Sequence, residues 1–168
     1  MAAIDQGENS RDAIVFTVES RSTRDTKVWG RRLASMLEGG ELLALVGDLG
    51  VGKTCFIKGL ARGLSLREEQ VLSPTFTMIQ EHEGRLPLYH IDLYRLEEVA
   101  LDDLGLREYL FSNAVAAVEW FERLREADTI NRLTIRISYS AANSRTIEFA
   151  AVGDRHRALI ARFRARFG

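Results

Sequence analysis

The stretch of the sequence most clearly suited to chemistry is Gly47-Asp48-Leu49-Gly50-Val51-Gly52-Lys53-Thr54, which fits the pattern G-x-x-x-x-G-K-[ST] of a phosphate-binding loop. Its glycines allow successive backbone N–H groups to turn inward around phosphate oxygens, and the positive end of the following helix points at the same oxygens. Lys53 adds a charge near the terminal phosphates, and Thr54 offers a hydroxyl to Mg²⁺. Residues 47–55, which include Cys55, are therefore the predicted nucleotide-binding segment.

Two carboxylates follow apolar segments and are candidates for the metal and for catalysis. Asp92 comes after Leu88-Tyr89-His90-Ile91, and Glu119 comes after the run Val115 to Val118. In an open parallel sheet the carboxyl ends of the strands meet at the ligand crevice, so both acids can reach Mg²⁺ and the attacking water. The predicted metal ligands are Thr54, Glu119 and Asp92. The division of roles between the two acids stays open, because an acid at either strand end can fill either role.

The elements that would hold these groups form an α/β pattern. Residues 42–46 are apolar without alternation, which is typical of a strand buried on both faces of a mostly parallel sheet. A helix is expected from Lys53 to about Arg62, closed by Gly63. Further strands are predicted at 88–91 and 114–118. The sequence thus predicts a P-loop NTPase-like fold, with a mostly parallel sheet flanked by helices and antiparallel edge strands.

The remaining segments complete one predicted domain at 13–168, preceded by a flexible terminus at 1–12. Ser22-x-x-Asp25 is the spacing of a helix start, and Gly39-Gly40 would end that helix. The other expected elements are a strand at 13–18, a hairpin turn around Glu83-Gly84, a helix over 96–111 with an acidic face, an antiparallel hairpin of 133–137 and 146–149, and a C-terminal helix with the apolar stripe Leu159, Ile160, Phe163 and Phe167.

Composition restricts the class of protein further. The 168 residues carry 23 Lys+Arg against 24 Asp+Glu, and 46% are apolar, so a full core can form without disulfides. The balanced charge gives no overall preference for nucleic acid or a membrane surface. Cys55 is the single cysteine, and the sequence shows neither an export signal nor an apolar run long enough to span a bilayer. A cytoplasmic location is expected.

Phosphate-binding loops serve several classes of protein, and missing motifs exclude some of them. No Asn-Lys-x-Asp motif for guanine and no L-S-G-G-Q transporter signature are present in the sequence. A small-molecule kinase stays open as an alternative, although the arginines between residues 60 and 110 are dispersed rather than gathered in a lid. A nucleotide-dependent binding module whose hydrolysis is incidental is the third alternative.

Four motifs resemble one bacterial family in order and spacing. They are the phosphate-binding loop at 47–54, Ser73-Pro74-Thr75-Phe76, His90-Ile91-Asp92-Leu93-Tyr94-Arg95-Leu96 and Val118-Glu119-Trp120. Together these motifs are similar to those of the TsaE (YjeE) family, the ATPases of the tRNA threonylcarbamoyladenosine pathway. The resemblance spans roughly residues 14–165.

This resemblance implies a protein that binds ATP with Mg²⁺, hydrolyses it slowly when alone, and acts with TsaD and TsaB. It would reach tRNA indirectly through that complex, as an accessory subunit rather than the transferase. Ser73, Pro74, Thr75 and Phe76 would form a switch-like loop that senses the γ-phosphate. Asp92 would assist Mg²⁺ or orient water, Glu119 would be the metal carboxylate, and Trp120 would lie near the nucleotide or the partner surface.

Three features of the sequence leave alternatives open. Phe121 stands where family members often carry Pro, which could alter the path of that loop. Cys55 lies in the first turn of a helix, a position expected to lower a thiol pKa and permit oxidation, although a buried packing role is the simpler interpretation. The arginines of the C-terminal helix could contact tRNA, but a solvated face opposite Leu159 and Phe163 explains them more simply; they are Arg155, Arg157, Arg162, Arg164 and Arg166.

Overall fold

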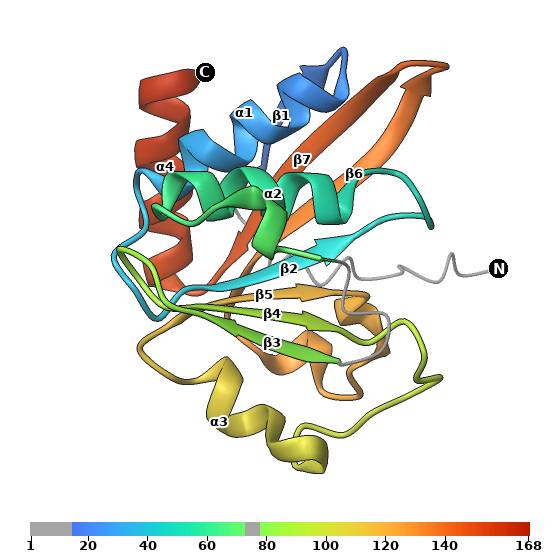
Figure 1. The fold of residues 1–168 in the computed structure, drawn as a ribbon, viewed down its shortest axis with the longest axis vertical. Coiled ribbons are helices and arrows are strands. Elements are labelled where there is room, and N and C mark those ends of the chain that lie inside the picture. Colours follow the sequence, from blue (N-terminus) through green and yellow to red (C-terminus); the bar gives the residue numbers. More distant parts are fainter. Residues whose placement is uncertain (1–14, 73–77) are drawn as a thin grey trace, which may run out of the picture.

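One mixed seven-stranded sheet organises the computed structural model, which describes residues 15–72 and 78–168 (Figure 1). The expected flexible terminus at 1–12 therefore lies outside the described residues. The strand order is β1-β7-β6-β2-β5-β4-β3. The strands are β1 (Val15–Ser20), β2 (Leu42–Val46), β3 (Ile79–His82), β4 (Leu88–Asp92), β5 (Val115–Glu119), β6 (Arg132–Ala141) and β7 (Ser144–Val152).

The centre of the sheet is parallel and its margins are antiparallel. Strands β6, β2, β5 and β4 pair in parallel, whereas β3 pairs antiparallel with β4 and β7 pairs antiparallel with both β6 and β1. The predicted fold class is confirmed by this arrangement. Since the four central strands run in one direction, their carboxyl ends reach the same edge, at the right of Figure 1.

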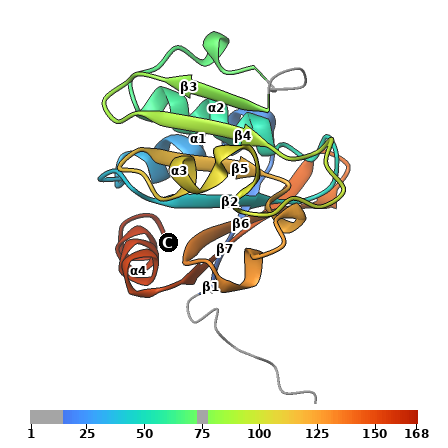
Figure 2. The same ribbon diagram turned by 90° about the horizontal axis from the view of Figure 1, so that it is seen from below.

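The sheet separates two apolar clusters. Because successive side chains of a strand point to opposite faces, Leu43 and Leu45 of β2 join one cluster while Leu42 and Ala44 join the other. The first cluster contains residues of α1 (Thr23–Ala34), α2 (Lys53–Gly63) and α4 (Asp154–Phe167), and the second contains residues of α3 (Leu106–Leu110). Figure 2 shows α4 beside β6 and β7. Within the described part of the chain, no helix is both long enough and apolar enough to cross a bilayer.

The first helix starts as its sequence predicts but ends early. The Ser22 side chain accepts a hydrogen bond from the backbone N–H of Asp25 at 3.1 Å, which caps α1. The predicted end at Gly39-Gly40 is wrong, because α1 stops at Ala34. The carboxylate of Glu41 accepts the backbone N–H groups of Glu38 and Gly39 at 2.8 and 2.9 Å, so these donors bond to a side chain instead of to helix carbonyls.

The prediction of one helix over 96–111 is also wrong. Only α3 and a 3-10 turn at Asp103–Gly105 are helical within that range. Leu104 and Gly105 have φ values of 57° and 68°, in the left-handed region that interrupts a right-handed helix. Short 3-10 helices also lie at Glu68–Gln70, Phe121–Arg123 and Ala127–Thr129.

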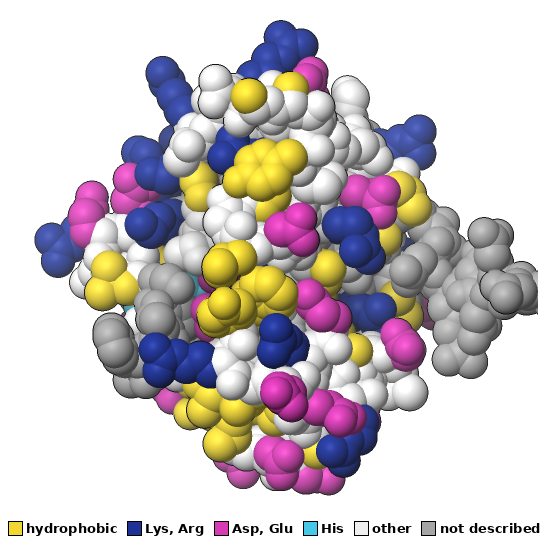
Figure 3. All heavy atoms as spheres, turned by 90° about the vertical axis from the view of Figure 1, so that its right-hand side faces the viewer, with side chains coloured by type: hydrophobic (Ala, Val, Ile, Leu, Met, Phe, Trp, Pro, Cys, Tyr) yellow, Lys and Arg dark blue, Asp and Glu magenta, His cyan; other side chains and the backbone are white. Residues whose placement is uncertain are grey.

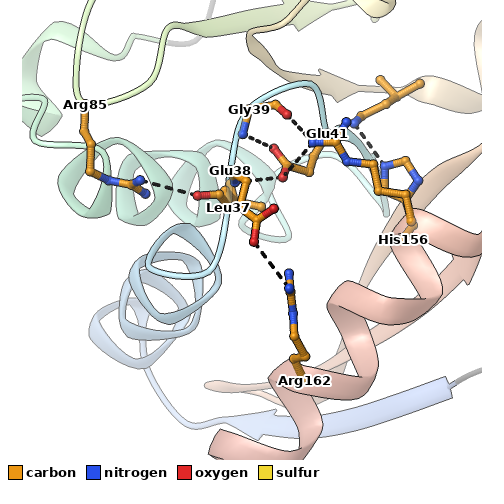
Figure 4. A network of polar contacts seen from close by, with 9 residues as sticks. Leu37, Glu38, Gly39, Glu41, Arg85, His156 and Arg162 are labelled. Carbon is orange, nitrogen blue, oxygen red and sulfur yellow. Dashed lines mark hydrogen bonds and ion pairs between the residues drawn. The ribbon is translucent and has the colours of Figure 1, made fainter.

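Several C-terminal arginines are held by local acids. Arg162 pairs with Glu38 at 3.3 Å (Figure 4). Arg155 contacts both the Glu41 carboxylate and the carbonyl of Gly39. Arg157 lies 3.7 Å from Asp154 on its own helix. These pairs account for part of the basic helix without nucleic acid, which favours the simpler of its two interpretations.

His156 ties the same helix to β2 and should make stability depend on pH. Its Nε2 accepts the backbone N–H of Leu42 at 3.2 Å, which requires a neutral ring (Figure 4). Burial lowers the His156 pKa from its ordinary 6.5, and the charge of Arg155 acts in the same direction. Below that pH the unfolded chain binds a proton that the folded chain does not, so the free energy of unfolding should decrease as pH falls, by up to about 1.4 kcal/mol per unit.

Urea unfolding at several pH values between 7 and 5 checks this prediction. The matched variant is His156→Gln, whose amide oxygen can accept the Leu42 N–H but does not titrate. Its stability should decline less steeply with acidity than that of the parent. Equal slopes in the two proteins would contradict the assignment of the effect to His156.

Candidate nucleotide-binding site

A cavity of about 400 Å³ lies at the carboxyl ends of β2, β4 and β5. Its walls come from the phosphate-binding loop, the start of α2 and the ends of β4 and β5. The lining residues are Leu49, Gly50, Gly52, Lys53, Thr54, Cys55, Met78, Asp92, Tyr94, Arg95, Glu119 and Trp120. The structure thus brings together most of the loop residues and both acids that the sequence singled out.

The glycines of the loop are required by its path. Gly47 has a φ of 152°, and a Cβ there would lie 2.3 Å from the carbonyl oxygen of Ile137. Gly52, the residue before α2, has a φ of 123°. A side chain at either position would force the backbone to move, so the curve of the loop, which is predicted to present N–H groups to a phosphate, depends on these glycines.

The β6–β7 hairpin holds the outer side of the loop. The Tyr139 hydroxyl donates to the carbonyl of Gly50 at 3.0 Å, and Arg145 Nε donates to the carbonyl of Val51 at 2.8 Å. Two carbonyls of the loop are therefore bonded to the hairpin. Sequence reasoning missed both residues, because nothing in an exposed hairpin pattern indicates which distant loop it will contact.

Lys53 is folded back onto the loop. Its Nζ donates to the carbonyls of Gly47 and Asp48 at 2.6 and 2.9 Å and lies 4.3 Å from the centre of the Trp120 ring. Burial lowers the Lys53 pKa from its ordinary range, while Glu119 is the largest of the charges that oppose this shift. A terminal phosphate would offer the ammonium group a full negative charge in place of two carbonyl dipoles.

Thr54 and Glu119 are bonded directly. The Thr54 hydroxyl donates to Glu119 Oε1 at 2.7 Å, although the two residues are 65 positions apart in the sequence. Since a hydroxyl has one hydrogen, this bond leaves the lone pairs of Thr54 available to a cation. Asp92 is the register partner of Glu119 across β4 and β5, and its Oδ1 accepts the backbone N–H of Tyr94 at 2.9 Å. Burial raises the Asp92 pKa, and the charge of Glu119 raises it further.

These oxygens fit Mg²⁺ better than they fit a transition metal. Mg²⁺ prefers oxygen ligands and commonly uses one or two carboxylates together with substrate phosphates. Across residues 15–72 and 78–168, no three His, Cys, Asp or Glu side chains are grouped as a metal site. The predicted set of Thr54, Glu119 and Asp92 would therefore need nucleotide phosphates and water to complete the coordination.

The thiol pKa of Cys55 is shifted in the direction opposite to the one that the redox hypothesis assumed. Burial raises the pKa of its thiol above the ordinary value, whereas its place in a helix first turn was expected to lower it. Its Sγ lies 3.3 Å from the carbonyl of Thr23, to which the thiol donates. Lys27 and Arg145 favour the thiolate, but they do not outweigh burial. The result favours a packing role over a redox role.

Trp120 lies beside the cavity, in a conformation that is rare for a non-glycine residue. Its φ and ψ are 58° and 40°, and its backbone is held by hydrogen bonds to Leu45 and Arg123. The indole ring packs against Tyr94, with ring centres 5.1 Å apart, and the Arg123 guanidinium lies over both rings. The sequence motif identified Trp120 but not this aromatic and arginine cluster.

The predicted switch-like residues Ser73, Pro74, Thr75 and Phe76 lie outside the described residues.

Comparison with known proteins agrees with this geometry. Residues 20–147 match the family model described as "Threonylcarbamoyl adenosine biosynthesis protein TsaE". The TsaE protein of Treponema pallidum is 42% identical over 132 residues, covering 78% of this chain and 97% of the relative. That of Bacillus subtilis is 44% identical over 136 residues, covering 80% and 85%.

A solved structure extends the agreement to three dimensions. The crystal structure titled as Bacillus subtilis YdiB superposes with a TM-score of 0.76 at 34% sequence identity, covering 92% of this chain and 97% of that one. The fold is thus that of the P-loop NTPases. With the family model covering most of the chain and relatives matched over most of their own lengths, this protein belongs to the TsaE family of tRNA threonylcarbamoyladenosine biosynthesis.

Proposed function

We propose that this protein binds ATP with Mg²⁺ in the cavity at the carboxyl ends of β2, β4 and β5 and hydrolyses it, as an accessory subunit that acts with TsaB and TsaD. The observation that carries the proposal is the Thr54–Glu119 bond beside Lys53. It joins the start of α2 to the end of β5 at the edge of one cavity. Such a placement would bring nucleotide phosphates bound at the loop close to a carboxylate that could hold the metal.

The chemistry assigned to the chain follows from its own groups. Lys53 and the loop N–H groups would bind the phosphates, while Thr54 and Glu119 would hold Mg²⁺. The metal, when bound, would neutralise charge that develops on the phosphates. Asp92, buried next to Glu119 with one oxygen bonded to Tyr94, would orient the attacking water through its other oxygen.

The side chains exposed around the cavity support the proposal that a partner protein binds there. Figure 3 looks onto the carboxyl ends of the central strands, where hydrophobic side chains gather near the middle of the face among charged ones. Leu49 is 67% exposed, and Tyr139 and Tyr94 are also exposed. Large apolar groups at the rim of a site are typical of a surface that another protein covers. Docking there would place TsaD or TsaB where it could respond to the nucleotide.

ATP turnover by the purified chain with Mg²⁺, alone and with TsaB and TsaD of the same organism, tests the proposal. Turnover should be slow alone, rise when the partners are added, and vanish in Lys53→Ala. A rate unchanged by the partners would contradict the accessory role. Phosphate transfer to a metabolite acceptor, with no response to the partners, would identify a small-molecule kinase instead.

A further inference from the structure

The most informative polar contact outside the predicted site residues joins His90 to Glu119. The imidazole Nε2 lies 2.8 Å from Glu119 Oε1, the same oxygen that accepts the Thr54 hydroxyl. His90 is fully buried, and Glu119 is only 4% exposed. Because an ionised carboxylate only accepts hydrogen bonds, Nε2 carries the hydrogen and donates it.

The register of the sheet explains why this contact forms. His90 of β4 is the register partner of Ala117 of β5, two residues before Glu119 on the same face. The small Ala117 side chain leaves room for the imidazole to reach along the sheet toward the carboxylate. The contact therefore depends on the parallel pairing of β4 with β5.

The other ring nitrogen indicates what the histidine does. Nδ1 is buried without a hydrogen-bond partner among the described residues, so the bond to Glu119 is the polar contact that the structure shows for this ring. A buried polar atom that lacks a partner lowers stability. An apolar side chain at this position would thus stabilise the fold equally well. It could not, however, donate the hydrogen bond that orients Glu119.

We propose that His90 is a positioning residue, which holds the Glu119 carboxylate in the orientation that a nucleotide-bound Mg²⁺ requires. This inference rests on the proposed function. Two donors, Thr54 Oγ and His90 Nε2, fix Oε1 on one side of the carboxylate. Among the described residues no donor is bonded to Oε2, so this oxygen is available to the metal or to a metal-bound water.

Without the imidazole, the carboxylate would keep only Thr54 as a partner and could rotate toward Lys53, whose pKa already responds to Glu119 more than to any other charge. Such a rotation would turn the carboxylate away from the metal and weaken metal binding. Groups that orient a metal ligand without touching the metal commonly change metal affinity or activity by about 10- to 100-fold when removed.

The decisive comparison is His90→Gln against His90→Asn. Both side chains are neutral amides, but only Gln can place an N–H near the position of Nε2. His82→Asn is the matched control, because His82 lies in the same hairpin and its Nε2 is buried without a partner. His90→Leu repeats the test with a side chain close in volume to the ring and with no polar atom.

The first measurement is the affinity for ADP, in EDTA and across a Mg²⁺ titration, and the second is the rate of ATP hydrolysis. In His90→Asn and His90→Leu we expect the ADP affinity measured in EDTA to stay within about twofold of that of the parent. The gain in ADP affinity on adding Mg²⁺ should be reduced, and kcat should be lowered about tenfold or more. His90→Gln should recover most of both quantities. His82→Asn should behave as the parent does.

Three results would overturn the inference. The first is a His90→Leu variant whose Mg²⁺-dependent gain in ADP affinity and whose kcat match those of the parent. The second is a His90→Gln variant that recovers no more of either quantity than His90→Asn does. The third is a loss of both quantities in His82→Asn equal to that in His90→Asn. A parent that binds ADP with a Mg²⁺-dependent gain but hydrolyses no ATP would refute the proposed function, while the ADP titrations would still decide the role of His90.

Discussion

Replacing Lys53 with alanine should abolish nucleotide binding. The ammonium group lies over the loop, bonded to the carbonyls of Gly47 and Asp48. Hydrogen bonds to charged partners are each worth about 1.5–3 kcal/mol, so the loss of those to a terminal phosphate should weaken ATP binding about 100-fold or more. Calorimetric titration with ATP and Mg²⁺ measures this directly.

The control for this variant lies on the same helix. Lys58→Ala removes an equal charge five residues further along α2, away from the residues that line the cavity, and should leave the affinity near that of the parent. Because Trp120 packs on Lys53, its fluorescence should change when phosphate draws the lysine away in the parent. If the ATP affinity of Lys53→Ala equalled that of the parent, the nucleotide would not be bound at this loop.

Replacing Glu119 with glutamine should stop hydrolysis while leaving nucleotide bound. The amide oxygen of Gln can still accept the bonds from Thr54 and His90, so the local structure should persist. The negative charge for the metal is lost, and a metal ion stabilises the transition state by several kcal/mol, so kcat should fall about 100-fold or more. Single-turnover assays across a range of Mg²⁺ concentrations, with a raised metal requirement expected, check this.

The Asp92→Asn variant separates the roles of the two acids. If Asp92 orients water, its replacement by the amide side chain of Asn should lower kcat. The Mg²⁺ concentration that gives the half-maximal rate should not change. The Tyr94 N–H can still bond to the Asn oxygen, which preserves the backbone turn. An increased Mg²⁺ requirement in Asp92→Asn, with none in Glu119→Gln, would reverse the assignment.

Local sequence signals were most reliable where a single physical cause fixes the structure. The unbroken apolar run at 42–46 is β2, and the Ser22–Asp25 spacing is the N-cap of α1, because burial and capping act over a few residues. They failed where a distant group or an unusual backbone conformation intervened. Glu41 accepts the backbone N–H groups of Glu38 and Gly39, in the segment where α1 was expected to continue, and the left-handed Leu104 and Gly105 interrupt the helix expected over 96–111.

The sequence by itself determined the phosphate-binding loop, the acids at two strand ends and the family resemblance. These features are contiguous motifs, so they can be recognised before any folding is known. The tertiary structure alone decided which oxygen of Glu119 is occupied, that His90 holds it, and that Tyr139 and Arg145 support the loop. Those contacts join residues 29 to 94 positions apart, and strand order and register, which no local pattern encodes, bring them within hydrogen-bond distance.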